Sequence, residues 1–155
     1  MAKAQAERVS ITQARSRAAR QALDALLWEV LWRPLGLPRD SRGSFRLAGE
    51  ELELAAWVGK ELAGGLVAVW TGPAEVEIRH LAVRPGLQRR GVGERLMAAL
   101  LARVAAGGCR RVHTVARNTS APFFERLGFA PSGPPLEHPA FQRHGIVFVP
   151  MARDL

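Results

Sequence analysis

Apolar side chains along the chain follow two periods, and each period predicts a different kind of element. Between residues 16 and 32 they recur every three or four positions, which predicts an amphipathic helix. The same spacing returns over residues 91–106, where Gly107-Gly108 ends the helix, and more briefly over residues 121–127. Apolar runs without this spacing predict strands, at residues 8–14, 51–58, 62–70, 76–83, 111–116, 129–130 and 146–151.

The connections between these elements define the fold class. Gly59-Lys60 and Thr71-Gly72-Pro73 are tight turns, so the three central strands are expected to form an antiparallel meander. The polar residues 39–44 and the proline-rich residues 131–139 are predicted loops. The order of elements predicts an α/β fold of the α+β kind, with a mixed, mostly antiparallel central sheet flanked by helices. At 155 residues the chain has the size of one domain, expected to span residues 1–155.

Composition changes this picture mainly through charge. The net charge is +8, and all but two of the 22 basic residues are arginines, which bind phosphates in a bidentate geometry. A basic balance favours anionic partners such as nucleic acid, an anionic membrane or a phosphorylated small molecule. Because the arginines are scattered without a dense tract, neither nucleic acid nor a membrane is expected as a partner. Nucleic-acid binding is kept only as a third hypothesis.

Several other classes of protein are not expected. No apolar run is long enough to cross a bilayer, and the opening MAKAQAERVS lacks an apolar signal core, so a cytoplasmic protein is expected. Cys109 is the only cysteine, which excludes an internal disulfide and leaves no cluster of thiolate ligands. No metal site is expected.

The stretch with candidate chemistry runs from residue 77 to residue 93. A strand ends, Pro85-Gly86 turns, and Gln88-Arg89-Arg90-Gly91-Val92-Gly93 opens the long helix. The first turn of a helix has unpaired backbone N–H groups and the positive end of the helix dipole, so glycines there let a diphosphate lie against the amides. Glycines can equally cap the helix or let it approach the sheet. Neither the Rossmann nor the P-loop glycine pattern is present.

Gln88-x-x-Gly91-x-Gly93 resembles motif A of the GNAT N-acetyltransferase superfamily. HLAVRP before the loop is similar to the strand that precedes this motif. Asn118 and PFFERLGF (residues 122–129) resemble the second signature of the family, and PMARDL at the end resembles its last strand. These segments cover about half of the chain, in the family's order.

The resemblance implies a GNAT-like fold and an N-acetyltransferase. The acetyl group would move from acetyl-CoA to a primary amine of a small molecule or protein, by direct attack in a ternary complex. The resemblance also implies a set of cofactor-binding residues. Main-chain groups of Leu81, Ala82 and Val83 would bind pantetheine, and backbone amides of Gln88, Arg89, Arg90, Gly91, Val92 and Gly93 would hold the pyrophosphate. Either Arg89 or Arg90 would reach the 3′-phosphate, Asn118 would lie beside the pantetheine, and Phe124 would flank the thioester.

Attack on the thioester requires a neutral amine, whereas a lysine-like ammonium has a pKa of about 10.4 in water. A base must therefore remove a proton, and Glu77 is the candidate, since some GNAT members carry a catalytic glutamate at this position. Pairing of Glu77 with Arg79 or with a neighbouring strand is the structural alternative. A regular strand would place Glu77, Arg79, Leu81 and Val83 on one face and Val76, Ile78, His80 and Ala82 on the other. His80 is interpreted as a core or supporting histidine.

One residue departs from the family pattern. Many GNAT members have a tyrosine where this chain has Phe124, and the chain contains no tyrosine that could protonate the leaving thiolate. The second hypothesis is therefore a non-catalytic sensor or assembly module that binds CoA. A nucleophilic role for Cys109 is a weak alternative.

The acceptor is expected to be bound by residues 16–44 and 131–145. His138 and His144, together with Glu137, are candidates for the wall of the acceptor pocket. The resemblance also allows a homodimer.

Overall fold

The computed structural model describes residues 8–46 and 48–155. The expectation about export rests on the opening segment, most of which lies outside these ranges. No helix within them is long and apolar enough to cross a membrane.

A seven-stranded sheet with the order β1-β2-β3-β4-β5-β7-β6 organises the molecule. Its strands are β1 (Val9–Gln13), β2 (Glu51–Val58), β3 (Glu61–Gly72), β4 (Glu75–Val83), β5 (Arg111–Arg117), β6 (Ala130–Pro131) and β7 (Phe148–Asp154). Only β4 and β5 pair in parallel, and the other pairs are antiparallel. The predicted meander and the mostly antiparallel sheet are thus confirmed.

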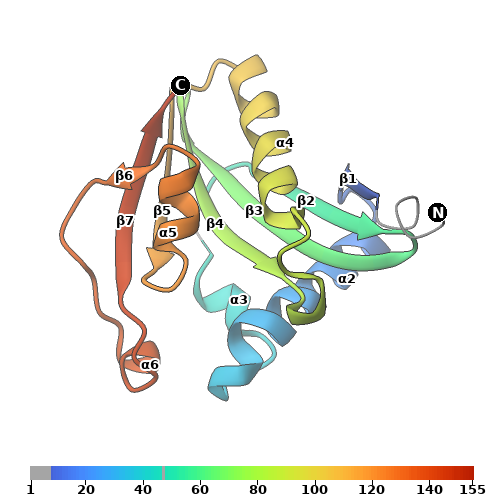
Figure 1. The fold of residues 1–155 in the computed structure, drawn as a ribbon, viewed down its shortest axis with the longest axis horizontal. Coiled ribbons are helices and arrows are strands. Elements are labelled where there is room, and N and C mark those ends of the chain that lie inside the picture. The colour runs from blue at the N-terminus through green and yellow to red at the C-terminus, as the bar shows by residue number, and fades with distance from the viewer. Residues whose placement is uncertain (1–7, 47) are drawn as a thin grey trace.

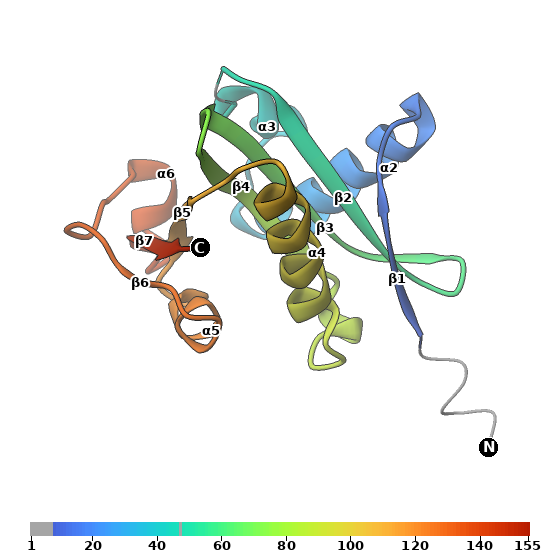
Figure 2. The same cartoon turned by 90° about the horizontal axis from the view of Figure 1, so that it is seen from above.

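Helices cover both faces of this sheet (Figures 1 and 2). Helices α4 (Val92–Ala106) and α5 (Ala121–Arg126) share one core with the sheet, centred on Leu66, Leu96 and Leu100. On the opposite face, α2 (Arg17–Leu27) and the π-helical turn η1 (Trp28–Trp32) form a second core around Leu23, Leu26 and Leu27, which are fully buried. The remaining short helices are η2 (Arg33–Leu35), α3 (Ser41–Ser44), η3 (Pro85–Leu87) and α6 (Pro139–Gln142).

Two segments predicted as loops contain helical turns. Within residues 39–44, α3 forms because Ser41 Oγ donates to the Pro38 carbonyl and buried Arg42 pairs with Glu53 of β2. After residue 138, α6 begins because the His138 ring accepts a hydrogen bond from the Ala140 amide at 3.1 Å, as a capping side chain does. Such short helices depend on tertiary contacts and leave no periodic pattern in the sequence.

The regular alternation predicted for β4 is wrong, because the strand has a bulge. Val67 of β3 faces His80 and Ala68 faces Ile78, so Arg79 has no partner in the β3 register. The extra residue reverses the parity, so Leu81 and Val83 join the α4 side of the sheet with Val76 and Ile78, while Ala82 joins the α2 side. Leu81 and Val83 therefore do not share a face with Glu77.

The parallel pair opens partway along its length. Pairing between β4 and β5 runs from Glu75↔Arg111 to Ile78↔Thr114 and stops there. β4 continues to Val83, and β5 continues beside β7 as far as Arg117↔Phe148. Figure 1 shows the two strands diverging beyond this point. The second half of β4 therefore turns one edge of its backbone toward an opening in the sheet.

Candidate active site

The loop before α4 has a constrained backbone. Arg89 has φ +66°, the only positive φ of a non-glycine residue in the described part of the chain, and Gly91 has φ +76°. Gln88 Nε2 anchors the loop by donating to the Val83 carbonyl at 3.2 Å. Residues held in the left-handed region gather at functional sites, where the surroundings impose the conformation.

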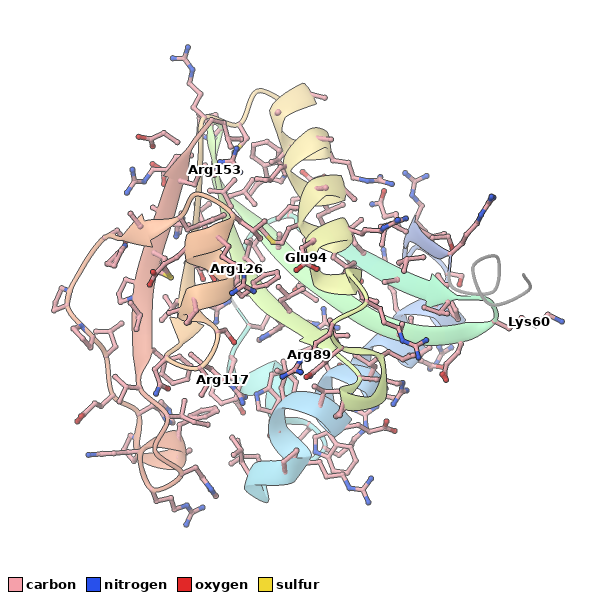
Figure 3. All side chains as sticks on the ribbon, in the orientation of Figure 1. Lys60, Arg89, Glu94, Arg117, Arg126 and Arg153 are labelled. Atoms are coloured by element: carbon pink, nitrogen blue, oxygen red, sulfur yellow. The ribbon has the colours of Figure 1, made fainter. Side chains whose placement is uncertain are left out.

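The start of α4 has backbone amides that no described side chain caps. Gly91 occupies the position before the helix, and no side chain caps the first turn. The N–H groups of Val92, Gly93 and Glu94 therefore lack the partner that a serine or aspartate would supply, as Ser16 does for α2. Figure 3 shows Arg89 on the loop that leads to this helix end. Uncapped amides, the helix dipole and a nearby arginine are features that can bind an anion.

Gly93 has a packing role in addition. A Cβ atom there would lie 3.1 Å from the ring of Phe123, on α5. Glycine at this position thus permits close contact between α4 and α5, a packing role that differs from the capping and the approach to the sheet expected as structural alternatives. At Gly91 the backbone conformation, with φ +76°, favours glycine.

A cavity of about 350 Å³ fills the opening between β4 and β5. One side is lined by residues of the α4 core, among them Ile78, Leu81 and Phe124. The other side is lined by aromatic residues of the α2 face, among them Trp32 and Phe141. The cavity thus passes from one face of the sheet to the other.

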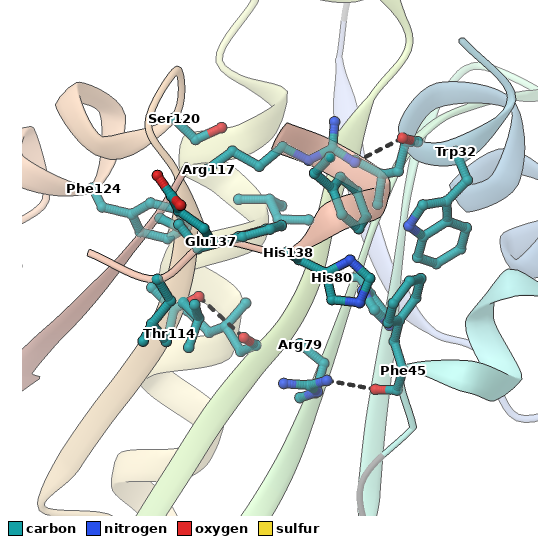
Figure 4. Close-up of a pocket in the computed structure, with 18 residues that line it drawn as sticks. Trp32, Phe45, Arg79, His80, Thr114, Arg117, Ser120, Phe124, Glu137 and His138 are labelled. Carbon is teal, nitrogen blue, oxygen red and sulfur yellow. Dashed lines mark hydrogen bonds between the residues drawn. The ribbon is translucent and has the colours of Figure 1, made fainter. Parts of the chain in front are cut away.

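Polar groups mark the edges of this cavity (Figure 4). Thr114 Oγ1 donates to the Ile78 carbonyl at 3.0 Å, at the point where the strands part. Arg117, at the end of β5, donates from Nη2 to the Leu31 carbonyl of η1 at 2.7 Å. Arg79, at the bulge, donates to the Phe45 carbonyl. The cavity is therefore framed by residues from β4, β5 and η1.

A family model described as an acetyltransferase (GNAT) domain matches residues 38–155. The chain belongs to the GNAT acetyltransferase family. The match includes β4, the glycine loop and α5, so the family and the enzyme class indicated by the motifs are confirmed.

Known GNAT proteins resemble this chain in sequence and in fold. An uncharacterized N-acetyltransferase of Bacillus subtilis strain 168, YvbK, is 32% identical over 92 residues. That match spans 57% of this chain and 58% of YvbK, so it leaves more than a third of the relative uncovered. Escherichia coli ElaA has a TM-score of 0.79 at 20% identity, over 94% of this chain and 99% of ElaA. A Bacillus subtilis acetyltransferase solved in complex with CoA has a TM-score of 0.69 at 24% identity. The comparison covers 96% of this chain and 99% of that acetyltransferase. These likenesses confirm the GNAT fold.

The structure brings only some of the expected GNAT residues to the cavity. Leu81 and Phe124 line it, and Phe124 is 4% exposed between Phe123 and Phe129. Asn118 holds two segments together: its Oδ1 accepts from the Val147 amide at 3.1 Å, and its Nδ2 donates to the Gly145 carbonyl at 3.5 Å.

Glu77 does not line the cavity. Its carboxylate pairs with Arg79 and lies 3.5 Å from Nδ1 of His113 on β5. Both pairings expected as the structural alternative, with Arg79 and with a neighbouring strand, are thus present. From its register opposite His113, Glu77 lies one residue before the point where the strands part.

Residues 131–145 contribute to the cavity wall as expected, with one difference. Glu137 and His138 line it, whereas His144 is not among the lining residues of the described chain. Trp32, from the expected segment 16–44, also lines it, although no single residue of that segment was singled out for the pocket. Sequence reasoning missed Phe45, Arg117 and Ser120, which line it as well. Their positions depend on how η1, α3 and the end of β5 converge, and no motif of the sequence marks them. Within the described ranges, no group of three or more acidic, histidine or cysteine side chains is placed to hold a metal ion.

His80 lines the cavity as a neutral ring. It packs edge-on against Trp32 with ring centroids 5.0 Å apart. Burial, followed by the positive charges of Arg79, Arg42, Arg117 and Arg46, lowers the pKa of His80 to about 3. A histidine with this pKa is a poor proton acceptor near neutrality, which favours the interpretation of His80 as a supporting residue.

This pKa makes stability depend on pH. Below pH 6.5 the unfolded chain protonates His80 while the folded protein does not until about pH 3, so stability falls as the pH falls. The slope from this residue is at most about 1.4 kcal/mol per pH unit. We expect the His80→Phe variant to lose this part of the slope in denaturant unfolding measured from about pH 7 to about pH 5. Equal slopes for the two proteins would contradict the assignment.

Proposed function

We propose that this GNAT protein binds acetyl-CoA between β4 and β5 and transfers the acetyl group to an amine. The observation that carries the proposal is the opening of the parallel pair beyond Ile78↔Thr114, next to the uncapped first turn of α4. An extended backbone edge, an anion site and a cavity through the sheet fit the arm, the diphosphate and the thioester of one molecule.

In this arrangement the diphosphate lies against the amides of residues 88–93, with Arg89 or Arg90 toward the 3′-phosphate. The pantetheine follows the free edge of β4 at Leu81, Ala82 and Val83, as an added strand would. The thioester then reaches the cavity beside Phe124. Asn118 supports this wall by fixing the end of β5 to the segment before β7.

The acceptor amine attacks the thioester carbonyl directly in a ternary complex. Its nitrogen forms the new bond to the acyl carbon, the CoA thiolate leaves, and the ammonium proton passes to a base. A covalent intermediate on Cys109 is disfavoured, because this thiol is 6% exposed, donates to the Arg111 carbonyl and precedes the far end of β5. The cavity lies at the other end of that strand.

We propose Glu77 as the base. Because its carboxylate does not line the cavity, it would accept the proton of the amine through a water molecule. We expect Glu77→Gln to lower the turnover number about 100-fold or more, with an unchanged acetyl-CoA affinity. Glu75→Gln is the matched control, because Glu75 is exposed and also lies near His113, with 3.8 Å between the carboxylate and Nε2. Steady-state kinetics of both variants test this. Turnover of Glu77→Gln equal to that of Glu75→Gln would remove Glu77 from the mechanism.

A sensor that binds CoA without turnover is the second candidate, favoured by Phe124 in the cavity wall. A thiol has a pKa of about 8.5, so a thiolate can leave near neutrality and take its proton from solvent. We therefore propose that transfer proceeds without a side-chain acid.

The function is tested by mixing the protein with acetyl-CoA and a panel of amines and following the release of free thiol. Release that depends on both protein and amine supports the transferase. Binding of acetyl-CoA without release for any amine supports the sensor. Salt-dependent retention on DNA without affinity for CoA would support the third hypothesis.

A further inference from the structure

One side of the cavity combines an aromatic wall with an arginine that no carboxylate of the described residues pairs with. Trp32, Phe45, Phe141 and Phe148 form the wall, with centroids of consecutive rings 5.1 to 6.0 Å apart. These side chains come from η1, the end of α3, α6 and the start of β7. They suit an apolar or aromatic body of a ligand.

Arg117 lies against this wall. Its guanidinium carbon is 5.4 Å from the centroid of the Phe141 ring, and Nη2 donates to the Leu31 carbonyl. A guanidinium has five N–H donors, and this bond uses one of them. Figure 4 shows the side chain extending from β5 toward η1 along the cavity. Arg117 can thus bind an anion and keep its present contacts.

No carboxylate of the described residues pairs with Arg117, although the side chain is partly buried. Arg79, the other arginine of the lining, differs because Glu77 neutralises it. Burial lowers the pKa of Arg117. A partly buried cation that no carboxylate pairs with has lost hydration without gaining a counter-charge, and a bound anion would offset that cost.

The charges around the cavity argue against a polycationic acceptor. Arg117 and Arg79 line the cavity, and Glu137 is the one carboxylate among the described lining residues. Arg42 and Arg46 also contribute to the low pKa of His80, but Arg42 pairs with Glu53 and Arg46 with Glu51, as Arg79 pairs with Glu77. Arg117 is the lining cation that no carboxylate of the described residues pairs with, and its charge repels an ammonium group and attracts a carboxylate.

We propose that the acceptor is a small amine carrying a carboxylate and an apolar body, such as an amino acid with an apolar side chain, and that Arg117 binds its carboxylate. This inference rests on the proposed transferase function. A hydrogen bond between charged groups contributes enough to change affinity about 10- to 100-fold. The carboxylate is therefore expected to determine the choice between otherwise identical amines.

Matched pairs of acceptors test this inference. Phenylalanine and phenethylamine share one body and differ in the carboxylate, as do leucine and isoamylamine. With wild-type protein and acetyl-CoA, we expect kcat/KM to be at least about 10-fold higher for each amino acid. Arg117→Gln should abolish this preference mainly through KM for the amino acid. Arg110→Gln is the matched control, because Arg110 is exposed just before the opposite end of β5.

Calorimetry with the two acetylated products provides a second readout that does not need turnover. N-acetylphenylalanine should bind the CoA-loaded protein at least about 10-fold more tightly than N-acetylphenethylamine. The inference would be overturned if N-acetylphenylalanine bound no more tightly than N-acetylphenethylamine, or if neither product bound. It would also be overturned if each amino acid and its matched amine gave equal kcat/KM. In those cases the transferase function stands if thiol is released with any amine, and it fails if acetyl-CoA itself does not bind. A melting curve establishes that Arg117→Gln is folded.

Discussion

Replacing Gly91 by valine is expected to weaken acetyl-CoA binding about 10- to 100-fold while leaving the protein folded. A non-glycine residue at φ +76° costs about 1–2 kcal/mol, and a β-branched side chain makes this conformation worse. The space around the site is open, with Glu94 Oε2 at 3.9 Å as the nearest atom, so the strain is relieved by moving the loop. Movement of the loop displaces the amides of residues 91–93 and removes one or two charge-assisted hydrogen bonds to the diphosphate.

Gly59→Val is the control for this variant. Gly59 has φ +63° and nothing within 4 Å of its added Cβ, so the two substitutions impose similar strain. It lies in the turn between β2 and β3, away from the opening. We expect a similar loss of stability in both variants and a loss of acetyl-CoA affinity only in Gly91→Val, measured by calorimetry. Unchanged affinity of Gly91→Val would show that the loop does not hold the cofactor.

Gly64→Ala is expected to damage both stability and cofactor binding through a single methyl group. Its Cβ would lie 2.7 Å from the Ala82 carbonyl oxygen of β4 and 3.1 Å from Cγ1 of Val92, at the start of α4. The backbone oxygen cannot rotate away, so β4 and α4 must shift. Overpacking of this kind costs about 1–3 kcal/mol. The two elements that move are the ones proposed to hold the pantetheine and the diphosphate.

Gly72→Ala, at the end of the same strand, tests whether this effect is local. Its added Cβ meets nothing within 4 Å. Thermal unfolding and an acetyl-CoA titration should separate the two variants, with a lower melting temperature and weaker binding for Gly64→Ala alone. If Gly64→Ala loses stability but binds acetyl-CoA like the wild-type protein, the end of β4 and the start of α4 do not form the site.

Most of the fold follows from local patterns in the sequence. The meander was predictable from turn residues, and α4 from its four-residue spacing and Gly107. The reversal of faces in β4 was not, because the bulge at Arg79 adds a residue without changing the apolar character of the run. The bulge depends on tertiary contacts, since Arg79 donates to the Phe45 carbonyl and pairs with Glu77.

The site was predictable where it depends on a contiguous motif. Residues 88–93 form the loop and helix start that the glycines indicate, and Phe124 lies in the cavity wall. The segments expected to bind the acceptor, residues 16–44 and 131–145, do supply Trp32 and Phe141 to the cavity wall. The contribution of Arg117 was not predictable, because these three side chains meet only after distant segments have folded. In a chain rich in arginine, the sequence does not distinguish Arg117 from the other arginines. The structure does so, because no carboxylate of the described residues pairs with Arg117.

A crystal structure of the protein with CoA tests the central claim most directly. The account predicts the diphosphate against the amides of residues 88–93, the pantetheine along β4 at residues 81–83, and the sulfur in the opening beyond Ile78 and Thr114. Density for CoA elsewhere, or a diphosphate that makes no contact with the start of α4, would contradict it.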